Sequence, residues 1–282
     1  MQRKHVTRVP LGCMLCLLML LAGCCFNMGS CAMRAKYQRT VQLSAPLSHG
    51  STFAAQTNNG SITINGADVA DCNLTATIVA RAETEEDAKE LAEKIKVTLE
   101  PLGNRLTARI ERPTNLRNKS VSVSLDINVP NQTNLELLTQ NGSVGITDIT
   151  GQVNAATHNG KVTAEKVSGS AILNTYNGSI ICTEISGDTQ LRTHNGSVKV
   201  FYSKDSPSVC SISLTTYNGG IYFSAPPDLS AQVNASTHNG SINTDLPIQV
   251  SGKVSKSKLT GTIGTGQGKL HLETYNGSIR IR

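Results

Sequence analysis

Six ring side chains stand immediately before Asn-Gly pairs, and they are the residues of this sequence best placed to form a binding surface. They are His158, Tyr176, His194, Tyr217, His238 and Tyr275. If successive strands stack in register about 4.8 Å apart, these side chains form one outward column. Such a column would offer ring faces on which sugars can stack. The other interpretation is a structural ladder, in which each neighbouring pair stabilises the stack by about 0.2–1 kcal/mol.

The sequence gives little support for metal binding or catalysis. His158 and His194 would lie two strands apart, about 9–10 Å, whereas zinc ligands lie about 2.0–2.1 Å from one ion. The acidic residues after residue 131 fall at mixed positions of the repeat, so they form no paired carboxylates. The sequence has no phosphate loop, dinucleotide fingerprint or Gly-x-Ser-x-Gly motif. We expect a non-catalytic protein with no metal and no cofactor; the alternative is an envelope enzyme that acts on polysaccharide.

A repeated motif carries the ring side chains. The string Thr-x-Asn-Gly-x-(Ile/Val) begins at Thr57, Thr139, Thr157, Thr175, Thr193, Thr216, Thr237 and Thr274. Four consecutive copies, 18 residues apart, hold Asn141-Gly142, Asn159-Gly160, Asn177-Gly178 and Asn195-Gly196. Within a copy the side chains alternate with the period of a strand, and Asn-Gly and Ser-Gly pairs mark corners where positive φ is accepted. The 37 residues between Asn239 and Asn276 predict a further, degenerate repeat there.

Two folds can be built from this unit of strand, corner and strand. Asn-Gly between alternating strands is typical of hairpins, which would give an antiparallel meander. Equivalent residues of a meander lie two strands apart, about 9.6 Å, so nothing would select the same residue at each position. A parallel β-solenoid stacks equivalent residues about 4.8 Å apart, which explains the Thr, Asn, Gly and Ile/Val columns. We therefore predict an all-β solenoid of about 18-residue turns, or rungs, right-handed by the usual sense of parallel crossovers.

Residues 41–130 do not follow this period, and they predict a mixed α+β cap on a solenoid of residues 131–282. Thr84 is a suitable N-cap for a helix over about 84–97, with acidic residues in the first turn and apolar residues on one face. Such a cap would protect the open end of the solenoid from edge pairing. A separate ligand-binding subdomain is the other role that this region could have.

The run Val121–Pro130 leads into the Thr-x-Asn-Gly-x-Val repeats with their Ser-Gly corners, and together they resemble the bacterial putative-adhesin family. The domains of that family form stacked β-solenoids in cell-envelope proteins. The resemblance covers about residues 40–282. It implies a solenoid with an adhesin-like or scaffolding role in the envelope, and it offers no catalytic residues to carry over.

Residues 1–23 have the form of a secretory signal peptide. Basic residues stand in the first ten positions, and the apolar run Leu11–Ala22 covers about 18 Å, too short for a hydrocarbon core of about 30 Å. Leu21-Ala22-Gly23-Cys24 resembles the bacterial lipobox, which implies cleavage before Cys24 and a lipid on its thiol. Residues 24–40 would then form a lipidated tether. An ordinary signal peptide with a chance cysteine is the alternative.

These two resemblances imply a protein that is secreted across the inner membrane and anchored in the envelope. Cys25 follows the anchor, where some inner-membrane lipoproteins carry Asp, and this favours the outer membrane. The expected partners are the membrane, through the lipid, and an envelope polysaccharide or another envelope protein. A structural subunit that associates end to end is a third possibility.

The composition is consistent with this location. The chain has 26 Lys+Arg and 20 Asp+Glu, and loss of the three basic residues of the signal leaves 23 against 20, a net charge of +3. So small an excess predicts no binding of nucleic acid. Of the eight cysteines, five remain after cleavage in addition to the anchor Cys24: Cys25, Cys31, Cys72, Cys182 and Cys210. Cys182 occupies an inward repeat position, which predicts a small core residue and not half of a disulfide.

Overall fold

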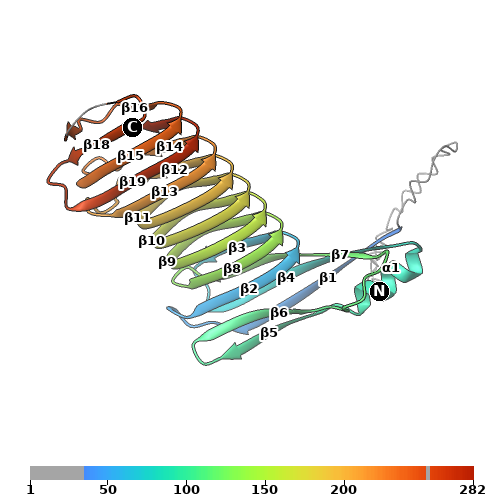
Figure 1. The fold of residues 1–282 in the computed structure, drawn as a ribbon. Helices are drawn as coiled ribbons and strands as arrows, with labels where there is room; N and C mark the ends of the chain where they lie inside the picture. The colour runs from blue at the N-terminus through green and yellow to red at the C-terminus, as the bar shows by residue number, and fades with distance from the viewer. Residues whose placement is uncertain (1–34, 252–254) are drawn as a thin grey trace, which may run out of the picture. The chain divides into compact units, whose positions relative to one another are not determined.

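Parallel stacking of equivalent residues organises the fold, which a computed structural model describes for residues 35–251 and 255–282 (Figure 1). The predicted signal peptide of residues 1–23, the predicted lipidation site Cys24 and residues 25–34 of the predicted tether lie outside the described residues. β-strands make up most of the described chain, together with one helix. In that part of the chain, no helix combines the length and the apolar character needed to span a membrane.

The solenoid winds from one Asn-Gly corner to the next. Its first strands are β2 (Thr52–Asn59), β3 (Ile62–Ala67), β8 (Asn134–Asn141), β9 (Val144–Asn159), β10 (Val162–Asn177), β11 (Ile180–Asn195), β12 (Val198–Tyr202), β13 (Ser211–Asn218) and β14 (Ile221–Ser224). β9, β10 and β11 pair in parallel, and Thr157, Thr175 and Thr193 lie in register. The predicted parallel β-solenoid is thereby confirmed, and the antiparallel meander is excluded.

The last rungs are stacked in an order that differs from the order of the sequence. They consist of β15 (Ala231–Asn239), β16 (Ile242–Thr244), β19 (Gly268–Asn276) and β20 (Ile279–Ile281). β19 pairs in parallel with β13 on one side and with β15 on the other, and β20 lies likewise between β14 and β16. The rung of Thr274 is therefore inserted between the rungs of Thr216 and Thr237 (Figure 1).

The chain between β16 and β19 covers the end of the solenoid. β18 (Lys258–Ile263) pairs antiparallel with β15, and β17 (Gln249–Val250) pairs antiparallel with β18. The prediction of a degenerate rung between Asn239 and Asn276 was therefore wrong. The strands of a rung pair in parallel with their neighbours, whereas β18 pairs antiparallel with β15. The segment instead turns back on β15 and pairs with the strand edge that β15 would otherwise expose.

The cap is built from the remaining elements that precede β8. They are β1 (Ala35–Pro46), β4 (Asp71–Ala82), α1 (Glu85–Glu93), β5 (Lys96–Leu102), β6 (Arg105–Glu111) and β7 (Ser120–Pro130). β4 pairs antiparallel with both β1 and β7, and α1 packs on β1 and β4. β6 runs parallel to β2 and β7 runs parallel to β3, so these two cap strands continue the stack beyond the first rung.

Three predicted boundaries differ from the structure. Residues 35–40, assigned to the tether, form the first half of β1. The solenoid does not start at residue 131, because β2 and β3 stack on β8 and β9 and interrupt the cap in sequence. The helix ends at Glu93, since β5 begins at Lys96, but its start agrees with the prediction: the Asp87 backbone N–H donates to the Thr84 side chain at 3.1 Å.

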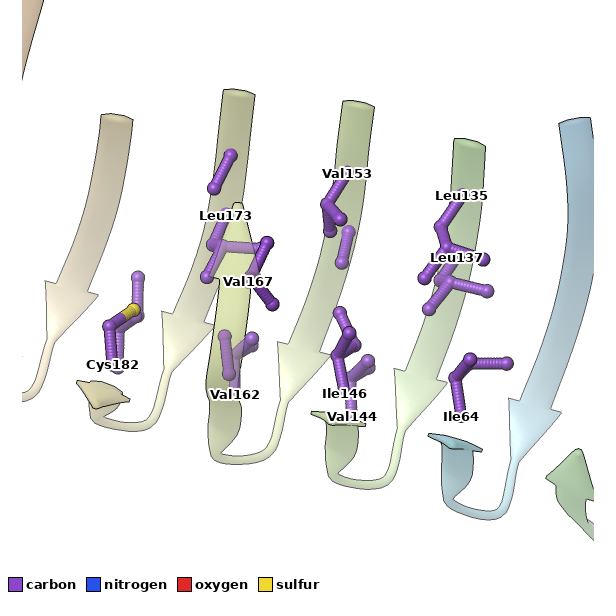
Figure 2. Packing of buried hydrophobic residues seen from close by; sticks show 14 of the residues in the cluster. Ile64, Leu135, Leu137, Val144, Ile146, Val153, Val162, Val167, Leu173 and Cys182 are labelled. Carbon is purple, nitrogen blue, oxygen red and sulfur yellow. The ribbon is translucent and has the colours of Figure 1, made fainter. Parts of the chain in front are cut away.

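Aliphatic side chains from both sides of each rung fill the interior. Figure 2 shows them stacked in rows across β8, β9 and β10: Leu135 lies in register with Val153, and Leu137 belongs to the same row as Leu173. Cys182 lies fully buried in one of these rows, in register with Ala164 and Val200, which confirms it as a small core residue. Burial raises the pKa of the Cys182 thiol to about 12, so the group stays protonated and unreactive at neutral pH.

Candidate functional site

The Asn column forms a continuous ladder of side-chain amides at the corners. Asn177 donates from Nδ2 to Oδ1 of Asn159 at 2.7 Å, and Asn195 donates to Asn177 at 2.8 Å. The ladder passes in the same way through Asn59, Asn141, Asn159, Asn177, Asn195, Asn218, Asn276 and Asn239. Every amide donates toward the cap. These residues therefore have a structural role, as expected for stacked identical amides.

The Thr column supports the same corners from inside. Thr175 Oγ1 donates to the carbonyl oxygen of Gly160 at 2.9 Å, and Thr193 donates to Gly178 at 2.8 Å. Buried hydroxyl groups need such partners, and the backbone of the preceding corner supplies them. The Thr column is consequently part of the scaffold.

Close approach of the backbone, and not positive φ, explains most of the corner glycines. A Cβ atom on Gly178 would lie 1.9 Å from the carbonyl oxygen of Gly160. Positive φ is found instead at the opposite corner, at Asp148, Lys166 and Glu184, with values of 57°, 51° and 54°. The sequence interpretation, which placed the left-handed residues at Asn-Gly, was therefore wrong for Gly178. Residues of three different types occupy the left-handed position, so only their 18-residue spacing could have revealed it.

The six ring side chains form one stacked column. In spatial order they are His158, Tyr176, His194, Tyr217, Tyr275 and His238. Neighbouring ring centroids lie 4.5–4.9 Å apart and neighbouring planes differ by 4–13°. The alternation of His and Tyr in sequence is broken in space, because the inserted rung places Tyr275 between Tyr217 and His238.

This face-to-face stacking decides which part of each ring a ligand can reach. The faces inside the column are covered by neighbouring rings, so a sugar face can stack only at the two ends. The ring edges remain open, and Tyr176, Tyr217 and Tyr275 are 46%, 43% and 40% exposed. Along its length the column therefore presents phenol hydroxyls and imidazole nitrogens, which bind by hydrogen bonds.

A groove runs beside the edges of the column. Its volume is about 780 Å³, within the usual range for ligand sites of about 300–1,000 Å³. Arg192 and Glu273 line it beside the rings, together with hydroxyl side chains such as Thr215. The groove thus combines hydrogen-bond donors and acceptors along the five strands β10, β11, β13, β19 and β15. Among residues 35–251 and 255–282, no three His, Cys, Asp or Glu side chains are grouped so that they could hold a metal ion.

Comparisons with known proteins found one family model and several solved structures. The family model described as Toastrack DUF4097 matches residues 28–282. A putative cell adhesion protein from Clostridium sporogenes is 10% identical, with 86% of this chain and 99% of that chain covered and a TM-score of 0.36. A putative adhesin from Bacteroides fragilis is 12% identical, with coverages of 86% and 97% and a TM-score of 0.43. A putative lipid binding protein from Parabacteroides distasonis is 10% identical, with coverages of 88% and 97% and a TM-score of 0.26. A search of the curated proteins found no match.

Proposed function

The chain belongs to the Toastrack DUF4097 family, and from this premise we propose that it is a non-catalytic, adhesin-like solenoid of the bacterial cell envelope. It would bind a surface polymer or an envelope partner along the ring column and the groove beside it. The scaffold would hold these groups in a fixed row, one rung apart.

The continuous ring column is the observation that carries this proposal. Its rings come from six rungs, and the hydrogen-bonded Asn and Thr columns fix the spacing of those rungs. A repeated polymer can form the same contact at each rung, so many weak contacts add up to one strong attachment. A small globular partner would touch only part of the row.

The ring column is tested by replacing Tyr176, His194 and Tyr217 with Ala and measuring retention of the protein on purified envelope polysaccharides. We expect at least about tenfold weaker binding, because three adjacent contacts are lost. Lys199→Ala, on the outward face of β12, is the control and should bind like the wild type. Full binding by a folded triple variant would exclude the ring column as the contact surface.

We propose further that a lipid on Cys24 holds the protein at the membrane, in the outer membrane in preference to the inner. The support comes from the lipobox resemblance at Leu21-Ala22-Gly23-Cys24. Cys24→Ala should abolish incorporation of a fatty-acid analogue and release the protein from the membrane fraction. Cys25→Ala is the matched control and should remain labelled. Equal labelling of Cys24→Ala and the wild type would contradict the anchor.

A further inference from the structure

The outward face of the solenoid changes character where the ring column ends toward the cap. There a hollow of about 740 Å³ lies over β2, β8 and β9 and is walled by the β5–β6 hairpin. It exists because β6 pairs with β2 only over Thr52–Ala55 and departs from it after Ala108. We call this space the hairpin hollow. It is separate from the groove beside Tyr217.

The floor of the hairpin hollow is less polar than the rest of the outward face. In the rungs below the hairpin, the outward residues two positions before the ring column are Gln56, Leu138 and Ala156. In the later rungs the same column holds Asn174, Arg192, Thr215, Glu273 and Ser236. Leu138 is 45% exposed on this floor, so the hollow offers an apolar side chain at a column position that is polar in the later rungs.

The wall of the hairpin hollow is basic. Arg105 is held by Glu136 at 2.7 Å, and Arg109 lies 3.5 Å from Glu100. Arg112, the residue after β6, also lines the hollow and forms no ion pair within the described residues. A guanidinium group binds a carboxylate through two parallel hydrogen bonds, so Arg112 is suited to an anionic group of a ligand.

The end of the ring column borders the same space. A second hollow of about 380 Å³ shares Gln56, Leu138 and Ala156 with the first and reaches His158. His158 stacks on Tyr176 with one face, and on its other side Gln140 of β8 is the next residue of the column, in register. Gln140 and Asn58 occupy the next two ring positions, so the ring column stops here. The hairpin hollow therefore borders the end of the ring column.

We propose that the hairpin hollow is a binding site for an acidic sugar of an envelope polysaccharide. The flat face of the sugar would lie on Leu138, and its carboxylate would bind Arg112. The inference rests on the proposed function and specifies the ligand class of the solenoid.

Two matched pairs of variants of the full chain test this site, with polygalacturonate as the acidic polymer and dextran as the neutral one. Arg112→Ala should weaken binding of polygalacturonate about tenfold. Arg117→Ala is its control and should keep full binding, because Arg117 carries the same charge in the same β6–β7 connection but does not line the hollow. Leu138→Glu places a carboxylate on the floor and should weaken binding by at least about tenfold. Ile172→Glu is its control, since Ile172 is 41% exposed on β10 outside the hollow.

The expected result is binding of polygalacturonate over dextran, lost in the two hollow variants and kept in the two controls with unchanged circular dichroism. Equal losses in variants and controls would overturn the site, because they would reveal binding by net charge alone. Equal binding of dextran would overturn the acidic ligand. Binding of other envelope polysaccharides, but not of polygalacturonate, would overturn this inference and leave the proposed function standing. If no polysaccharide bound, both would fail.

Discussion

Gly178→Ala is expected to destabilise the protein by about 3 kcal/mol or more, a large effect for one added methyl group. The methyl carbon would lie 1.9 Å from the carbonyl oxygen of Gly160, and that carbonyl belongs to the corner of the preceding rung. The oxygen cannot withdraw easily, because it also accepts the hydrogen bond from Thr175. The variant must therefore separate two rungs. For a domain of this size the midpoint of thermal unfolding should fall by about 6–12 °C.

Gly145→Ala is the matched control for this prediction. It lies in β9 of the same solenoid, and the nearest heavy atom to its added methyl group would be Thr163 Oγ1 at 3.6 Å, an ordinary contact. Its stability should stay within about 1 kcal/mol of the wild type. If both variants unfolded at the wild-type temperature, close packing of the corners would not be what selects glycine there.

Leu272→Asp should destabilise the last rungs by about 3–5 kcal/mol, because it leaves an unpaired charge in the core. Leu272 is fully buried in β19, in register with Leu214 of β13 and Ala235 of β15. Since β19 lies between these two strands, hydrogen exchange should show loss of protection in both. If β19 were instead the terminal strand, as the sequence order suggests, Leu272→Asp would reduce the hydrogen-exchange protection of β19 without affecting that of β13.

Lys269→Asp is the control for this second prediction, since it introduces the same residue on the outward face of the same strand. It should leave the hydrogen exchange of β13 and β15 unchanged. Protection retained in β13 after Leu272→Asp would contradict the inserted position of β19.

The corners could be predicted from the sequence because each of three repeated positions has one physical task. The Asn amides bond to one another, the Thr hydroxyls bond to the backbone, and glycine permits the close approach, so every copy needs the same residues. The start of α1 was equally clear, because Thr84 accepts a free backbone N–H and the acidic first turn suits the helix dipole.

Because every corner needs the same residues, the order of the last rungs could not be predicted from the sequence. The corner of Thr274 is equivalent to every other corner, so its sequence does not specify which two strands it joins. The antiparallel β18 decides the order by covering β15. The hairpin hollow was also beyond prediction, because it depends on where β6 leaves β2, and no residue pattern marks Ala108 as that point.

The one-way amide ladder gives the side chains of the corners a common direction. Each carboxamide points its N–H toward the cap, and the Thr hydroxyls donate in the same direction, whereas the backbone N–H groups of the corner glycines donate away from the cap and offset these side-chain dipoles. The last donors of the two columns, Asn59 and Thr57, end on the carbonyl oxygens of Val121 and Val123. These four residues also line the hairpin hollow. The donor ends of both side-chain columns therefore lie at the hairpin hollow, and their acceptor ends lie at the opposite end of the solenoid, near Asn239.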